Sequence, residues 1–188
     1  MDNDIRGSPE NLRVLISAVR WSIMIVHLFG PCNSGKTTLR NRLKERHPGF
    51  DSYCIDDFRR AVGDGTLEKE IDAQDLFVDA VADSHNGFFE CSGAGRCAMY
   101  ALMCRREETR IVVYDTPAEA CIERIDEHKY DGIPFPFEND DTDIIRGVRS
   151  FLDSESFRHL TEGIPVLHLG GDESLEEQLA AVERFCGI

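Results

Sequence analysis

The sequence predicts an α/β fold, a three-layer sandwich in which helices cover both faces of a five-stranded parallel sheet. Two observations predict it. Short runs rich in β-branched and aromatic residues alternate along the chain with stretches of helical periodicity, which is the pattern of parallel βα units. The chain has 188 residues, enough for one domain with a sizeable core. We expect an N-terminal extension over residues 1–20 and a single domain over residues 21–188.

Five strands are expected where the apolar or aromatic runs are short: residues 21–29, 52–56, 87–91, 110–115 and 163–169. The helical stretches between and after them are residues 39–46, 57–84, 94–106, 117–128 and 175–185. A break is expected in the second helix at Gly63 and Gly65, and Pro117 suits the first turn of its helix. The acidic cluster at residues 140–143 is expected to start a further helix rather than to hold a metal.

The first expected strand leads into a loop with the pattern G-x-x-x-x-G-K-[ST], the P-loop. The loop and the residue after it are Gly30, Pro31, Cys32, Asn33, Ser34, Gly35, Lys36, Thr37 and Thr38. Where such a loop joins a strand to a helix, successive backbone N–H groups of the loop and the helix start bind the phosphates of a nucleotide. Lys36 would reach the β- and γ-phosphates, and the Thr37 hydroxyl would ligate Mg²⁺. The flanking strand and helix argue against a chance match in a turn, so we expect nucleotide binding.

Charge and cysteine content narrow the classes of partner. Lysine and arginine number 21 against 35 aspartate and glutamate residues, a formal net charge of −14. Long-range repulsion then disfavours a nucleic-acid substrate or an anionic membrane surface, although a local basic pocket is compatible with this charge. The seven cysteines contain no C-x-x-C pair, and we expect reduced thiols in a cytoplasmic protein. The apolar run at residues 14–29 is too short and too interrupted to cross a membrane.

A second chemical site is expected around Asp56. This residue closes the second expected strand, and ligands of open parallel sheets bind at the carboxyl ends of strands. A carboxylate there would accept the proton of a hydroxyl group, as the general base of phosphoryl transfer. Its neighbour Asp57 is alternatively the N-cap of the following helix. Arg59 and Arg60 either clamp an anionic acceptor or are solvated on the first helical turn.

The sequence Asp56-Asp57-Phe58-Arg59 reads D-D-x-R. With the P-loop, it resembles the small P-loop kinases, especially the polynucleotide-kinase-like group. The zeta-toxin and chloramphenicol-phosphotransferase kinases are similar in the position of the base aspartate. The resemblance covers about residues 23–185 and implies a P-loop NTPase architecture of the nucleoside-kinase-like type with a small lid. It also implies that Asp56 is the general base and that Arg59 contacts the acceptor.

The same resemblance implies roles for residues further along the chain. Glu90 lies where related kinases carry an acidic residue near Mg²⁺; the alternative is a polar strand terminus. Arg124 occupies the first position of an R-x-x-x-R lid pattern, whose arginines neutralise charge on the transferred phosphoryl group, but His128 stands at the second position. Residues 129–141 are then a lid that excludes water or an ordinary surface loop. The loop at residues 92–96 suits contact with the acceptor.

The sequence therefore predicts an enzyme, a phosphotransferase that uses ATP and Mg²⁺ and acts on a hydroxyl group of a small molecule or nucleotide. The catalytic residues would be Lys36, Asp56, Arg59 and Arg124, and the metal residues Thr37 and Glu90. Two alternatives stay open: a P-loop ATPase or nucleotide-dependent switch with no phosphoryl acceptor, and a non-catalytic ATP-binding module. The sequence indicates no oligomeric state.

Overall fold

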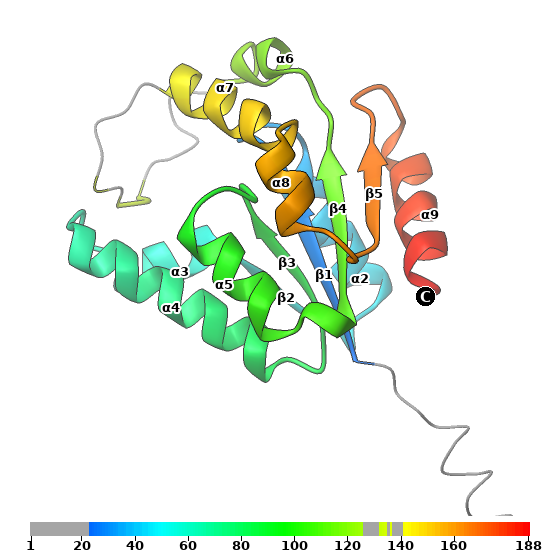
Figure 1. Cartoon of the computed structure of the whole chain (residues 1–188), viewed down its shortest axis with the longest axis horizontal. Helices are drawn as coiled ribbons and strands as arrows, with labels where there is room; N and C mark the ends of the chain where they lie inside the picture. Colours follow the sequence, from blue (N-terminus) through cyan, green and yellow to red (C-terminus); the bar gives the residue numbers. More distant parts are fainter. Residues whose placement is uncertain (1–22, 126–131, 135, 137–140) are drawn as a thin grey trace, which may run out of the picture.

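The computed structural model describes residues 23–125, 132–134, 136 and 141–188, and a five-stranded parallel sheet forms its centre (Figure 1). The strands are β1 (Met24–Phe29), β2 (Asp51–Cys54), β3 (Asn86–Cys91), β4 (Thr109–Tyr114) and β5 (Val166–Leu169). Their order across the sheet is β2-β3-β1-β4-β5, and every adjacent pair is parallel. The predicted fold class is confirmed, and β1 lies in the middle of the sheet.

Helices cover both faces of this sheet. They are α2 (Lys36–Arg46), α3 (Ile55–Val62), α4 (Leu67–Asp83), α5 (Arg96–Cys104), the 3-10 turn η1 (Arg106–Glu108), α6 (Ala118–Ile122), α7 (Asp141–Leu152), α8 (Glu155–Leu160) and α9 (Leu175–Cys186). Alternate residues of a strand point to opposite faces. Ile25 and Phe29 of β1 therefore join a core with α4, α5, α7 and α8, whereas Val26 and Leu28 join a core with α2 and α9. Figure 1 shows α5 and α8 in front of the strands and α2 behind them.

Several expected elements occur with shifted ends. The predicted helix over residues 57–84 is divided as expected: α3 ends before Gly63, and Thr66 caps α4 by accepting the backbone N–H of Lys69 at 3.3 Å. The last strand begins at Val166 rather than at Gly163. Gly163 has a φ of +79°, which is a turn conformation and not an extended one.

The prediction that Asp56 closes a strand was wrong. The alternative left open for Asp57, a structural cap of the following helix, is met at the third helical position and not at the N-cap itself. Strand β2 ends at Cys54, which is itself the N-cap of α3, and Asp56 lies in the first turn of that helix. The reason is local. The carboxylate of Asp57, at the third helical position, accepts the backbone N–H of Cys54 at 2.8 Å. This closes a capping box and starts the helix at Ile55.

The chain after β4 differs most from expectation. Helix α6 ends at Ile122, earlier than predicted, because the N–H groups of Arg124 and Ile125 bond to the carbonyls three residues back, at 3.3 Å and 3.0 Å. Such bonds tighten the chain into a turn. Asp141 starts α7 as the acidic cluster predicted, whereas α8 was not predicted. The expected extension over residues 1–20 and most of the expected lid over 129–141 lie outside the described residues.

Among the described residues, no helix has the length and apolar character needed to span a bilayer.

Candidate active site

The loop between β1 and α2 forms a tight bend at the carboxyl end of the central strand. Gly35, the N-cap of α2, has a φ of +105°, and Asn33 has a φ of +65°. Both values lie in the left-handed region that glycine and asparagine tolerate best. A Cβ at Gly30 would lie 2.9 Å from Ser34 Oγ and 2.9 Å from Tyr114 Cβ, so only glycine fits there. Such a bend at a helix N-terminus presents a concave row of N–H groups, which suits a polyphosphate.

Lys36, the first residue of α2, is buried and holds its ammonium group inside this bend. Its Nζ donates to the backbone carbonyl of Pro31 at 2.6 Å and to Ser34 Oγ at 3.3 Å. Both partners are neutral oxygens, which a phosphate oxygen replaces favourably because a hydrogen bond between charged groups is stronger. Thr116 supports the loop from outside, since its hydroxyl donates to the carbonyl of Ser34 at 3.3 Å.

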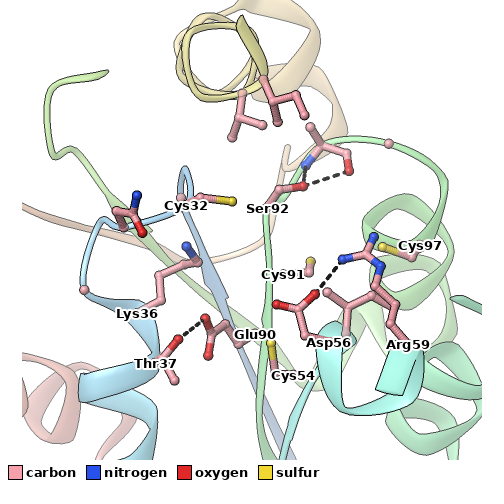
Figure 2. A pocket seen from close by; sticks show the side chains of 18 of the residues that line it. Cys32, Lys36, Thr37, Cys54, Asp56, Arg59, Glu90, Cys91, Ser92 and Cys97 are labelled. Atoms are coloured by element: carbon pink, nitrogen blue, oxygen red, sulfur yellow. Dashed lines mark hydrogen bonds and ion pairs between the residues drawn. The ribbon is translucent and has the colours of Figure 1, made fainter. Parts of the chain in front are cut away.

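Thr37 faces Glu90, which lies near the end of β3 (Figure 2). Thr37 Oγ1 donates to Glu90 Oε1 at 2.7 Å, and Arg40 Nε lies 3.3 Å from the other oxygen, Glu90 Oε2. Mg²⁺ prefers oxygen ligands and is usually held by one or two protein groups, with phosphates and water completing the coordination. The adjacent hydroxyl and carboxylate therefore fit a magnesium ion. The described residues contain no group of three His, Cys, Asp or Glu side chains placed to hold a metal by themselves.

Asp56 and Arg59 of α3 lie across the cavity from Lys36 (Figure 2). Arg59 Nη1 donates to Asp56 Oδ1 at 2.7 Å, and its Nε and Nη2 donate to the two oxygens of Glu70 on α4 at 2.8 Å and 2.6 Å. Gln74 Nε2 also donates to Glu70, at 2.7 Å. Burial raises the pKa of Glu70, but the hydrogen bonds from Arg59 and Gln74 outweigh it and bring that pKa below its ordinary value. Burial lowers the pKa of Arg59, and its carboxylate partners more than reverse that effect.

Arg124 reaches the same region from the turn after α6. Its Nη1 donates to the backbone carbonyl of Asn33 at 3.4 Å, and Asn33 Nδ2 donates to the carbonyl of Cys121 at 3.2 Å. The turn is therefore tied to the phosphate-binding bend. His128, at the second position of the predicted lid pattern, lies outside the described residues.

One cavity of about 610 Å³ connects the phosphate-binding bend, the pair Thr37 and Glu90, the first turns of α3 and the turn that carries Arg124. Its walls include every residue predicted to be catalytic or to hold the metal: Lys36, Thr37, Asp56, Arg59, Glu90 and Arg124. Gly30, Cys32, Asn33, Gly35 and Thr38 of the predicted nucleotide-binding set line it as well. Pro31 and Ser34 are buried in the loop behind the wall. Arg60 does not line the cavity and pairs with Asp57 at 3.6 Å.

The sequence interpretation missed several residues that shape this site. Arg40 pairs with the carboxylate of Glu90, Glu70 holds Arg59, and Gln74 donates to Glu70. Ile144 and Val148 of α7 close the apolar side of the cavity. A signal for Glu70 was present. Glu70, Ala73, Phe77 and Val81 share the buried face of α4, and a carboxylate in an apolar stripe needs a cationic partner. The pattern of buried residues on α4 does not, however, indicate that this partner is Arg59.

The sequence matches no protein-family model and no curated protein. Solved structures do match it. A gluconokinase of Sinorhizobium meliloti 1021 is 13% identical, with a TM-score of 0.61 over 88% of this chain and 93% of that chain. A shikimate kinase of Acinetobacter baumannii in complex with shikimate is 17% identical, with a TM-score of 0.60 over 91% and 97%. The APS kinase of Mycobacterium tuberculosis in complex with AMPPNP and APS is 15% identical, with a TM-score of 0.57 over 88% and 98%. At these identities the likeness shows the fold, which this chain shares with the three kinases.

Proposed function

We propose that this protein is a phosphotransferase that moves the γ-phosphoryl group of ATP, in a Mg²⁺-dependent reaction, to a hydroxyl group of a small molecule. The observation that carries the proposal is the single cavity in which Lys36 and Thr37 lie across from Asp56. Phosphoryl transfer depends mainly on holding donor and acceptor in line and on stabilising charge. A phosphate-binding bend and a carboxylate on opposite walls of one cavity meet both needs.

On the donor side, the loop N–H groups and Lys36 would bind the β- and γ-phosphates. Lys36 would exchange its bonds to the Pro31 carbonyl and the Ser34 hydroxyl for bonds to phosphate oxygens. Thr37 and Glu90 would hold Mg²⁺, which when bound neutralises charge on the β- and γ-phosphate oxygens. Arg124 would stabilise charge on the group in transfer.

On the acceptor side, Asp56 would accept the proton of the attacking hydroxyl. Arg59 holds one oxygen of this carboxylate through its bond of 2.7 Å. Arg59 therefore positions the acceptor through Asp56, because the carboxylate cannot turn freely while the guanidinium is fixed by Glu70.

Two further considerations support a small-molecule acceptor, and a third supports a reducing compartment such as the cytoplasm. The gluconokinase, shikimate kinase and APS kinase with which the fold is shared are named for small acceptors. The net charge of −14 disfavours a nucleic-acid substrate. All seven cysteines are free thiols. The narrower resemblance to the polynucleotide-kinase-like and zeta-toxin-like enzymes stays a prediction.

The proposal is tested by incubating the protein with γ-labelled ATP, Mg²⁺ and separate pools of hydroxyl-bearing metabolites and oligonucleotides. We expect label to enter a small molecule, to require Mg²⁺, and to disappear with Asp56→Asn. Release of labelled phosphate without a labelled acceptor would instead indicate an ATPase or a switch. Binding of ATP with no loss of its label would indicate a non-catalytic module. Either result contradicts the proposal.

A further inference from the structure

The cations that line the cavity divide into two groups according to the partners that hold them. Lys36 and Arg124, on the nucleotide side, donate to neutral oxygens of residues 30–37. Arg59 and Arg96, on the acceptor side, are held by carboxylates of the chain itself. Among the described residues, the positive charge available to a ligand is therefore concentrated at the nucleotide side.

Arg59 and Glu70 form the contact that decides the character of the acceptor side. The two oxygens of Glu70 lie on Nε and Nη2 of Arg59 at 2.8 Å and 2.6 Å. This two-pronged arrangement is the one in which arginine binds the carboxylate or phosphate of a ligand. Glu70 thus occupies, from within the protein, the edge of Arg59 that an anionic acceptor would use.

Glu70 is not easily displaced from this position. It is only 4% exposed, and Gln74 donates a further hydrogen bond to it. A ligand anion that took Arg59 would leave a carboxylate buried beside it, and a buried charge that loses its partner is strongly unfavourable. The contact between Glu70 and Arg59 therefore disfavours any ligand that would need to displace Glu70.

The carboxylates around the acceptor side also outnumber their cations. Arg59 pairs with both Asp56 and Glu70. Arg40 pairs with Glu90 at 3.3 Å and shares Asp57 (3.2 Å) with Arg60 (3.6 Å). Arg96 is directed to Asp75 at 2.6 Å, with its guanidinium 5.0 Å from the ring centroid of Tyr100. An incoming anion would meet this surplus of negative charge in addition to finding Arg59 occupied.

We propose that Glu70 excludes anionic acceptors and that the compound phosphorylated by this protein is an uncharged polyhydroxy compound, such as a sugar or an alditol. The inference rests on the proposed phosphotransferase function and narrows its acceptor. The remaining acceptor wall suits such a compound. Asp56, Gln74 and Ser92 offer hydrogen-bonding groups for hydroxyls, and Ile144 and Val148 offer an apolar surface for the carbon skeleton.

The first test uses acceptor pairs that differ in charge and share their hydroxyl groups. The pairs are gluconamide and gluconate, methyl shikimate and shikimate, and glucuronamide and glucuronate, each with γ-labelled ATP and Mg²⁺. We expect the uncharged member of at least one pair to be labelled at least roughly tenfold faster than its anionic partner. Equal rates, or faster labelling of the anion, overturn the inference while leaving phosphoryl transfer established. No labelled product with these pairs or with the metabolite pools overturns the proposed function, and the inference with it.

The second test removes the charge of Glu70 and measures the preference between the charged and uncharged acceptors. Glu70→Gln keeps the volume of the side chain but removes its negative charge and one of the two acceptor oxygens that hold Arg59. We expect the ratio of kcat/KM for the anionic member to kcat/KM for the uncharged member to rise by roughly tenfold, mainly through KM, because any loosening of Arg59 and Asp56 affects both acceptors alike. Glu68→Gln is the matched control, because Glu68 is an exposed carboxylate on the same helix, and it should leave the preference unchanged. A purely structural Glu70 would instead lower activity with both acceptors in parallel, and that outcome overturns the inference. The acceptor-pair test stands even if Glu70→Gln does not fold.

Discussion

Two helices, α2 and α3, begin at the same edge of the sheet and face the same cavity, yet their first turns are chemically opposite. Helix α2 starts after Gly35 with no side-chain cap and no acidic residue in its first turn. Helix α3 starts after Cys54 with a capping box and with Asp56 and Asp57 in its first turn. A helix N-terminus attracts anions through its unpaired N–H groups and its dipole.

The difference teaches that a helix start becomes a phosphate site only where the chain leaves its N–H groups uncovered. In α3 the chain supplies its own anions, so the same backbone geometry positions a carboxylate instead of binding a phosphate. The cavity therefore has a side prepared for the charged part of one substrate and a side prepared to accept a proton from the other. The predictions below separate the contributions of these two sides.

The largest expected effect comes from Asp56→Asn, which removes the base on the α3 side. We expect the rate of phosphoryl transfer to fall by about 10²–10⁴-fold, the usual contribution of general base catalysis. The dissociation constant for ATP should stay within a few-fold, since Asp56 lies across the cavity from the bend. Transfer is measured with γ-labelled ATP and ATP binding by calorimetry. Asp79→Asn, at an exposed position of α4, is the control. Unchanged transfer in Asp56→Asn would show that this residue is not the base.

A somewhat smaller effect is expected from Arg124→Gln on the nucleotide side. Removing a group that stabilises transition-state charge lowers kcat by about 10²–10³-fold in comparable sites. Binding of ATP in the ground state should weaken much less than kcat falls. Steady-state kinetics and calorimetry separate the two, with Arg158→Gln on the exposed part of α8 as the control. A loss confined to ATP affinity would assign Arg124 to ground-state binding alone.

Glu90→Gln should act on the metal rather than on the nucleotide. Glu90 accepts a hydrogen bond from the Thr37 hydroxyl at 2.7 Å, so its carboxylate would bind the ion and also orient Thr37, the other proposed ligand. We expect the Mg²⁺ concentration needed for half-maximal ATP binding to rise by roughly tenfold, as for losses of supporting ligands elsewhere. A Mg²⁺ titration of fluorescent-nucleotide binding measures it. An unchanged midpoint would place the magnesium ion away from Glu90.

The smallest effect on the difference between the two sides of the cavity is expected from acid pH. Protonation of His27 would lower the stability of the whole fold and would therefore affect both sides alike. His27 on β1 is fully buried against the rings of Phe29 and Phe89, and burial lowers its pKa from 6.5 to about 3. The unfolded chain then binds a proton that the folded chain excludes. Stability should therefore fall as the pH drops from about 6.5 toward 3, by up to about 1.4 kcal/mol per pH unit from this group.

Urea denaturation of His27→Leu between pH 4 and 7 tests this effect, since leucine at this position has no proton to bind. The variant should show a shallower loss of stability on acidification than the wild-type protein. His159→Leu, at an exposed position, should keep the wild-type slope. Identical slopes for the wild type and His27→Leu would mean that His27 is not buried in its neutral form.

The sequence predicted those parts of the site that are formed by residues adjacent in the chain. The loop at residues 30–37 and the pair Asp56 and Arg59 were found because each group is contiguous and follows a strand. The exact position of Asp56 was wrong because the carboxylate of Asp57 caps the helix two residues earlier than the apolar pattern suggests. The order of the sheet, with β1 between β3 and β4, follows from tertiary pairing and could not be read from the alternation of elements.

Glu70 shows why the rest could not be predicted. Its role depends on the packing of α4 against α3, which brings its carboxylate to Arg59, a residue eleven positions earlier in the chain. Likewise, Ile144 and Val148 reach the cavity only because α7 folds back over the end of the sheet. Helical periodicity identifies a buried face, but it does not identify what that face contacts.

The central claim is that backbone N–H groups of residues 30–37 and the ammonium group of Lys36 bind the polyphosphate of a nucleotide. Calorimetric titration of the purified protein with ATP and Mg²⁺ tests this claim most directly, with Lys36→Met as the comparison. We predict saturable binding to the wild-type protein and affinity at least roughly tenfold lower for Lys36→Met. Absence of binding to the wild type at millimolar ATP, or equal affinity for the two proteins, would contradict it.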